Sequence, residues 1–331
     1  MLASLREPMH PAPLCTISGG NNVRFISATE ISYVTNPSSN DPIRNTSTIW
    51  RASLTNEHNT VAVVSVQGMV MDFAWSPDGF AVAYLVYAEA PGLGSGSANQ
   101  LWLKIGKTPA RALTPMMPLF GRGGSLDDEN IVRFSHDGKF LLMIDTYVSG
   151  GAPPSPDQAA FQVHSIPDGN VVFVPPSAQN PSGRGAFTTM AAWSHQSDRL
   201  YYRDPAGIQT WDPPGTQGTM AGGLSWSSPS VSPDDRFVAY VVRDIGNALE
   251  GQPHVEIREL GTNKVTVIPG VRGAPFFASG TVLFEVEYGP NPEQGPGPRY
   301  IPTGKGFAYD VRANVETQTK GVISPIDYWP H

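Results

Sequence analysis

One hairpin-like segment restricts the folds open to this chain more than any other feature. Residues 73–84 consist of two apolar runs around the turn Ser76-Pro77-Asp78-Gly79. Pro77 presets φ for a type I turn, the Asp78 side chain can bond its own backbone, and Gly79 supplies a left-handed position at no steric cost. The segment is therefore predicted to form a tight β-hairpin.

Related segments repeat along the chain, at residues 23–33, 132–143, 192–202, 230–240 and 275–284. The serine that opens the turn stands at positions 76, 135, 194 and 232, so successive intervals are 59, 59 and 38 residues. A four-stranded propeller blade takes roughly 40 residues. The longer intervals therefore indicate the same blade with long connections.

Further strand-like segments follow each hairpin. Third strands with apolar and polar residues in alternation are expected at 48–52, 100–105, 161–165, 208–211, 254–258 and 306–311. Outer strands are expected at 60–64, 171–174 and 264–268. This pattern predicts an all-β chain, a six-bladed β-propeller with four antiparallel strands per blade, in preference to seven blades. Residues 1–331 are expected to form a single domain, in which the lead-in 1–20 either supplies a ring-closing strand or lies on the surface as a tail.

The motif at 75–79, followed by Ala83-Tyr84 and echoed at Ser135, Ser194 and Ser232, resembles the repeat of TolB-type β-propellers. This WD-like repeat also occurs in the propellers of prolyl-oligopeptidase-type peptidases. The fourth copy departs from it, with His195-Gln196-Ser197 in place of Pro-Asp-Gly. The resemblance implies a protein partner, in a bacterial envelope or as the sensor part of a larger receptor. It favours a periplasmic or other extracytoplasmic location over the cytoplasm.

Composition excludes several classes of function. The formal net charge is -7 and the 22 Lys and Arg residues are scattered, so no nucleic-acid partner is expected. Cys15 is the only cysteine, so an intrachain disulfide is impossible. No apolar run has the length of a membrane span, so no direct membrane insertion is expected, and the chain is interpreted as a soluble monomer.

The predicted connections differ in length between the two ends of the blades. The turns between first and second strands are short. The other connections are long and rich in Pro, Gly, Ser and Asn, at 36–46, 88–98, 115–129, 148–158, 175–187 and 288–304. Long loops without secondary structure in a compact fold are usually functional. The face that carries them, around the central channel, is therefore the predicted binding surface.

Charged residues and tyrosines gather at the ends of the second strands, on that predicted face, while Asp128 and Glu129 precede the first strand of the third blade and Arg133 lies within it. Arginines can bind a ligand bidentately and tyrosine rings can stack on it. The alternative is that Arg and Asp of neighbouring blades pair with each other and hold the rim together. The candidate ligand-binding residues are Tyr87, Glu89, Asp128, Glu129, Arg133, Asp145, Tyr147, Arg203, Asp204, Arg243, Asp244, Glu287 and Arg299.

The sequence contains no motif for catalysis. Residues 92–96 have the wrong order for a Gly-x-Ser-x-Gly nucleophile elbow, and the seven histidines lack metal-ligand spacing, so neither a metal nor a cofactor is expected. Asp128, Asp145 and Glu287 are the candidates for a glycosidase carboxylate pair. The predicted function is a non-catalytic binding or protein-interaction module for a protein or peptide, with carbohydrate as another ligand class. The alternative is a polysaccharide lyase or hydrolase acting in the channel mouth.

Overall fold

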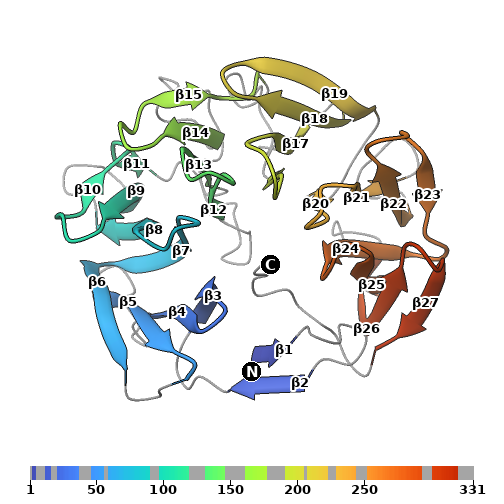
Figure 1. The fold of residues 1–331 in the computed structure, drawn as a ribbon, viewed down its shortest axis with the longest axis horizontal. Helices are drawn as coiled ribbons and strands as arrows, with labels where there is room; N and C mark the ends of the chain where they lie inside the picture. The colour runs from blue at the N-terminus through green and yellow to red at the C-terminus, as the bar shows by residue number, and fades with distance from the viewer. Residues whose placement is uncertain are drawn as a thin grey trace. The chain divides into compact units, whose positions relative to one another are not determined.

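A computed structural model describes residues 2–4, 12–15, 21–36, 46–55, 59–89, 97–118, 131–145, 161–176, 191–204, 207–222, 229–243, 252–292 and 300–319. Every named element among these residues is a β-strand (Figure 1). The chain divides into two compact units, one formed mainly by Ile17–Thr189 and the other mainly by Met190–Pro325 with Met1–Thr16. Each unit is described separately.

The unit around Ile17–Thr189 contains three antiparallel sheets, which form blades one to three. Blade one consists of β3 (Asn21–Ser27), β4 (Glu30–Thr35), β5 (Thr46–Ser53) and β6 (Thr60–Gln67). Blade two consists of β7 (Met69–Trp75), β8 (Ala81–Glu89) and β9 (Ser97–Ile105), with β10 (Arg111–Ala112) and β11 (Met117–Pro118) both paired to β9. Blade three consists of β12 (Ile131–Phe134), β13 (Phe140–Ile144), β14 (Phe161–Ser165) and β15 (Val171–Phe173).

The other unit contains blades four to six. Blade four is β16 (Ala191–Trp193), β17 (Leu200–Asp204), β18 (Gly207–Asp212) and β19 (Thr216–Gly222). Blade five is β20 (Ser230–Val231), β21 (Phe237–Arg243), β22 (Pro253–Glu259) and β23 (Val265–Val267). Blade six is β24 (Arg272–Phe277), β25 (Val282–Pro290), β26 (Tyr300–Asp310) and β27 (Val315–Gln318). These sheets confirm the predicted six-bladed β-propeller with four antiparallel strands per blade.

Apolar side chains fill the space between successive blades of each unit. Phe73 and Tyr84 of blade two pack with Val34 and Ile49 of blade one. Buried aromatic rings recur at corresponding positions of the blades: Tyr84, Phe134, Trp193, Tyr202, Tyr240 and Phe284 are all at most 9% exposed, whereas Trp75 is half-buried. Full burial of such a side chain stabilises the fold by about 1.5–3 kcal/mol. The packed faces of the sheets therefore supply the main stabilisation of each unit.

Hydrogen bonds of the serine and the aspartate stabilise the turn between the first and second strands. In blade two, Ser76 Oγ donates to the Asp78 carboxylate and accepts the Ala81 amide at 2.8 Å, while the Phe80 amide donates to Asp78. Gly79 has the left-handed φ of 66° that the turn requires. This network closes one end of the sheet, here called its turn end.

The opposite end of each sheet, where the second strand ends and the third begins, is here called its connection end. Two expectations about it need correction. The strands β25 and β26 extend into the predicted loop 288–304, with Tyr288 paired to Pro302 and Pro290 paired to Tyr300. Among the described residues, neither β24 nor β27 pairs with Pro290 or Pro302, so the missing N–H donors of these prolines break no pairing with a third strand. In blade two, Glu89 pairs with Ser97, and β11 lies within the predicted loop 115–129.

The strand expected within the lead-in is observed with a different partner. β2 (Ala12–Cys15) pairs antiparallel with β1 (Leu2–Ser4) in a sheet of two strands. Among the described residues β2 therefore adds no fifth strand to blade six.

Candidate functional site

Tyr87 and Glu89 lie near the end of β8, at the connection end of blade two. Tyr87 is half-buried and lies between Met69 of β7 and Asn99 of β9, whereas Glu89 is exposed beside Ser97. Neighbouring residues of a strand point to opposite faces, so Tyr87 and Glu89, two apart, share one face. This hairpin therefore presents an aromatic ring and a carboxylate together.

Arg133 lies on β12 and forms part of a charged cluster, here called the Asp72 cluster. Arg133 Nη1 is 2.7 Å from Asp72 Oδ2, and Arg24 Nη2 is 2.8 Å from Asp72 Oδ1. The Val132 amide donates to Asp72 Oδ2 at 2.8 Å. The three side chains come from the first strands of blades one, two and three. For Arg133, the structure shows the pairing of Arg and Asp from neighbouring blades that the sequence left as the alternative.

The electrostatics of the Asp72 cluster favour the ionised carboxylate. The Asp72 side chain is only 3% exposed, and burial alone would raise its pKa. The charges of Arg133 and Arg24 and the amides of Val132 and Phe73 outweigh that effect and lower the pKa below its ordinary value. The carboxylate therefore stays charged at neutral pH.

Asp145 follows β13 and is fully buried. Its two carboxylate oxygens accept hydrogen bonds of 2.8 and 2.9 Å from Asn99 Nδ2 of blade two. A buried polar group needs such hydrogen bonds to offset its lost hydration. Asp145 thus joins two neighbouring sheets near their connection ends.

In the other unit, three predicted residues lie at the ends of second strands. Arg203 is buried on β17, and the half-buried Asp204 accepts a hydrogen bond from Gln209 Nε2 at 3.3 Å. Arg243 ends β21 and its backbone pairs with Pro253. Five of the predicted residues, Asp128, Glu129, Tyr147, Asp244 and Arg299, lie outside the described residues.

Glu287 belongs to a second charged group, here called the Arg272 cluster, within blade six. Arg272 donates to Glu316 from Nε at 3.1 Å and from Nη2 at 3.0 Å, and its guanidinium lies 3.9 Å from the centre of the Phe307 ring. Glu287 lies 3.9 Å from Arg272 and 3.0 Å from Lys305 Nζ. The cluster thus joins four strands of one sheet.

The same cluster contains a buried carboxyl group that the sequence did not identify. Glu285 Oε1 lies 3.8 Å from Arg272 Nε, and the Glu285 side chain is 0% exposed. Burial raises the pKa of Glu285 to about 9, and the nearby Glu316 carboxylate adds to this effect while Arg272 opposes it. Glu285 is therefore protonated at neutral pH.

Sequence reasoning missed Arg24, Asp72, Arg272, Glu285 and Glu316. Asp72 and Glu285 stand within strands whose neighbours are apolar, in VMDFAW and VLFEVE. A charged residue within such a run is the signal that could have identified them, because a buried charge needs a partner.

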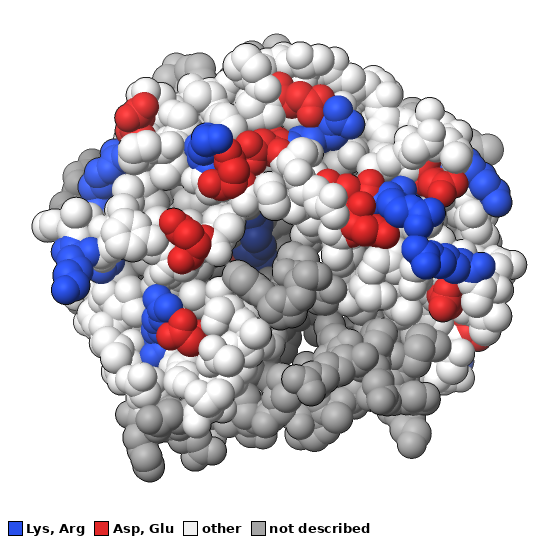
Figure 2. Space-filling view, viewed as in Figure 1, with Lys and Arg blue, Asp and Glu red and all other residues white. Residues whose placement is uncertain are grey.

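The face seen in Figure 2 carries acidic and basic side chains in small mixed groups, and no patch of one sign dominates among the described residues. Within the described ranges, no three His, Cys, Asp or Glu side chains are grouped so as to hold a metal ion. No helix in the described part of the chain has the length and apolarity to cross a bilayer.

No protein-family model matches the chain, and no curated protein matches it in sequence. Similar folds occur among solved structures. The structure of TolB from Acinetobacter baumannii aligns with a TM-score of 0.44 and 17% identity, over 89% of this chain and 64% of TolB. The β-propeller domain of the trilobed protease from Pyrococcus furiosus aligns with a TM-score of 0.52 and 11% identity, over 90% of this chain and 82% of that domain.

An acylaminoacyl peptidase from Pyrococcus horikoshii aligns with a TM-score of 0.52 and 11% identity, over 92% of this chain and 46% of the peptidase. The chain therefore spans less than two thirds of TolB and less than half of the peptidase. At these identities the likeness concerns the fold alone. The chain is a six-bladed β-propeller, and its sequence repeat resembles that of TolB-type propellers.

Proposed function

We propose that this chain is a non-catalytic interaction module, a single propeller domain that binds a protein or peptide partner through the connection ends of its sheets. The observation that carries the proposal is the difference between the two ends of the sheets in blades two and six. At the turn end of blade two, Ser76 and Asp78 close the turn with short hydrogen bonds. At the connection ends of blades two and six, paired strands extend further and carry Tyr87, Glu89 and Tyr288.

Blade six illustrates the connection end best. β25 and β26 continue as a two-stranded extension, in which Tyr288 pairs with Pro302 and Pro290 pairs with Tyr300. The Tyr288 ring lies against Gly273, where an added Cβ would come within 2.6 Å of it. A ring supported in this way loses little conformational entropy on binding, and tyrosine is enriched in protein interfaces.

The charged residues near this extension fit a protein partner as well. Glu287 is held by Lys305 at 3.0 Å and by Thr303 Oγ1 at 2.8 Å, so its carboxylate is fixed before any partner arrives. Positively and negatively charged side chains held in place around aromatic rings favour specific binding of a protein over binding of a polyanion such as a nucleic acid. An extracytoplasmic location, implied by the repeat's resemblance, belongs to the same proposal.

Site-specific photocrosslinking in the native host tests this function. A benzoylphenylalanine replaces Glu89 or Tyr288 at the connection ends. The matched control replaces Phe80, which is 61% exposed at a turn end. We expect a discrete covalent adduct, identified by mass spectrometry, from positions 89 and 288 and none from position 80. Equal labelling at position 80, or adducts only with small oligosaccharides, would contradict the proposal.

A further inference from the structure

Three blades close their turn with an aspartate of their own. Two residues after the opening serine stands Asp78 in blade two, Asp137 in blade three and Asp234 in blade five. In each case the serine hydroxyl donates to that carboxylate, and a following amide donates to it as well. The carboxylate thus satisfies backbone donors that the turn would otherwise leave without partners.

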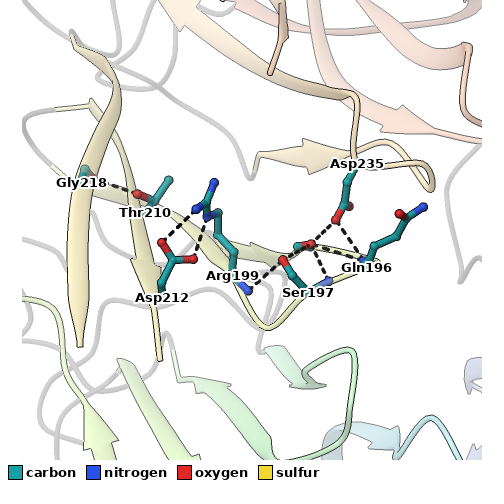
Figure 3. Close-up of polar contacts among 8 residues, drawn as sticks. Gln196, Ser197, Arg199, Thr210, Asp212, Gly218 and Asp235 are labelled. Carbon is teal, nitrogen blue, oxygen red and sulfur yellow. Dashed lines mark hydrogen bonds and ion pairs between the residues drawn. The ribbon is translucent and has the colours of Figure 1, made fainter. Parts of the chain in front are cut away.

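Blade four has Gln196 at this position and cannot make the same network. Its turn nevertheless has the same length, because the Ser194 amide bonds to the Arg199 carbonyl at 2.8 Å, as the Ser76 amide bonds to the Ala81 carbonyl in blade two. A carboxylate is present, but it comes from the turn of blade five (Figure 3). Ser194 Oγ and the Gln196 amide donate to Asp235 Oδ2, and the His195 amide donates to Asp235 Oδ1 at 2.8 Å.

Asp235 occupies the position that glycine fills in other blades. Gly79 and Gly138 stand three residues after their serines with φ of 66° and 74°, and Asp235 stands three residues after Ser232 with φ of 53°. A side chain in this left-handed region has a steric cost that glycine avoids. The cost indicates that the Asp235 carboxylate has a role that glycine cannot fill.

Blade three indicates where a side chain at this position, three residues after the serine, would point. A Cβ added to Gly138 of blade three would lie 3.3 Å from Pro77 Cδ and 3.8 Å from Ser76 Cβ, both in the turn of blade two. The position therefore faces the turn of the preceding blade. Blade five has its own complete network through Asp234, so Asp235 is not needed there.

We propose that Asp235 is a positioning residue that acts for the preceding blade, replacing the aspartate that the turn of blade four lacks. The two turns then form one hydrogen-bonded unit that links blade four to blade five at their turn ends. This inference is independent of the proposed binding function, because it concerns the opposite end of the sheets.

Hydrogen exchange of single amides, followed by NMR, tests the proposal. Asp235→Gly removes the carboxylate and the left-handed strain together. We expect exchange of the His195 and Gln196 amides to become at least about 10-fold faster, since their acceptor is lost. Exchange of the Ser194 amide, which bonds to the Arg199 carbonyl, should also become faster, because the turn loses the carboxylate that holds Ser194 Oγ. In Gln196→Asp/Asp235→Gly, each turn has an aspartate two residues after its serine, and blade five has the glycine that blades two and three have at the next position. We expect this double variant to restore slow exchange of the Ser194 amide, which closes the hairpin.

The matched control is Asp234→Ala, which removes the network within blade five. It should speed exchange of the Arg236 amide and leave the His195 and Gln196 amides unchanged. Two results would overturn the proposal. One is unchanged exchange of the His195 and Gln196 amides in Asp235→Gly. The other is a Gln196→Asp substitution that fails to slow Ser194 exchange in the Asp235→Gly background.

Discussion

The Asp72 cluster and the Arg272 cluster use the same kinds of side chain in opposite proportions. In the first, one carboxylate lies between two guanidiniums, at 2.7 and 2.8 Å. In the second, one guanidinium lies within 4 Å of three carboxylates, those of Glu285, Glu287 and Glu316. Two arginines keep a buried acid ionised, whereas one arginine shared among three acids leaves the most buried of them protonated.

The two clusters also make the stability of the fold depend on pH in different ranges. The pKa of Asp72 is lowered, so its contribution to stability is present above about pH 4, the ordinary range of aspartate, and is lost as the pH falls further. The pKa of Glu285 is raised to about 9, so its protonated form contributes fully below about pH 4.5. That contribution is lost as the pH rises toward 9.

The largest effect is expected from Asp72→Asn, which removes the one acid from between two arginines. Loss of one partner of a buried ion pair costs about 3–5 kcal/mol, and the Val132 amide loses a charged acceptor. Urea unfolding at pH 7 measures the change. A cost below about 1 kcal/mol would show that the arginines find other partners and that the cluster is not a stabilising centre.

Arg272→Met is expected to cost less, about 1.5–3 kcal/mol, the range for hydrogen bonds to charged groups. The substitution keeps the packing on Phe307 but removes the two hydrogen bonds to Glu316. Because Glu285 is protonated and neutral at pH 7, the loss of Arg272 leaves only the carboxylates of Glu287 and Glu316 without this positive charge. Urea unfolding again gives the value, and a larger loss than that of Asp72→Asn would reverse the ranking of the two clusters.

Glu285→Gln sharpens the comparison through its pH dependence. At about pH 5 the variant should match the unsubstituted protein, because the carboxyl group it replaces is neutral there. As the pH rises from 5 to 9, the variant should become progressively more stable than the unsubstituted protein, by at most about 1.4 kcal/mol per pH unit. Thermal unfolding at several pH values measures this divergence, and parallel curves would refute a protonated Glu285.

The smallest effect is expected from Asp212→Asn, which breaks the ion pair between Arg199 and Asp212. Arg199 Nε is 2.7 Å from Asp212 Oδ1, but the two side chains are 46% and 33% exposed. An exposed pair contributes about 0–1 kcal/mol. If urea unfolding showed a loss of stability equal to that of Asp72→Asn, burial would not explain why the two clusters contribute more to stability than exposed ion pairs do.

The repeat fold was predictable from the sequence because each blade carries its own turn signal. Ser76, Asp78 and Gly79 act on one another within four residues, so their roles follow from local chemistry alone. The charged clusters were not predictable in this way. Arg133 was identified as a candidate, but its partner Asp72 stands 61 residues earlier. The pairing depends on how two sheets pack, which no local pattern encodes.

The fourth blade shows the same limit. The sequence reveals that Gln196 breaks the turn pattern, yet the compensating Asp235 looks like an ordinary member of its own turn. The extent of the strands at the connection end was also underestimated. Proline and glycine around Tyr288 indicated a loop, but the β25–β26 hairpin tolerates proline where, among the described residues, neither β24 nor β27 pairs with it.

The outer strands of blades one and two differ in a way that bears on aggregation. In blade two the outer strand is divided into β10 and β11, which present only two residues each. Short, interrupted edges resist pairing with another molecule. β6 of blade one is a continuous strand of eight residues with Val61 57% exposed, and β5 is its partner among the described strands. Of these two blades, blade one should therefore be the more prone to self-association at high concentration, and a lysine in place of Val61 should reduce it.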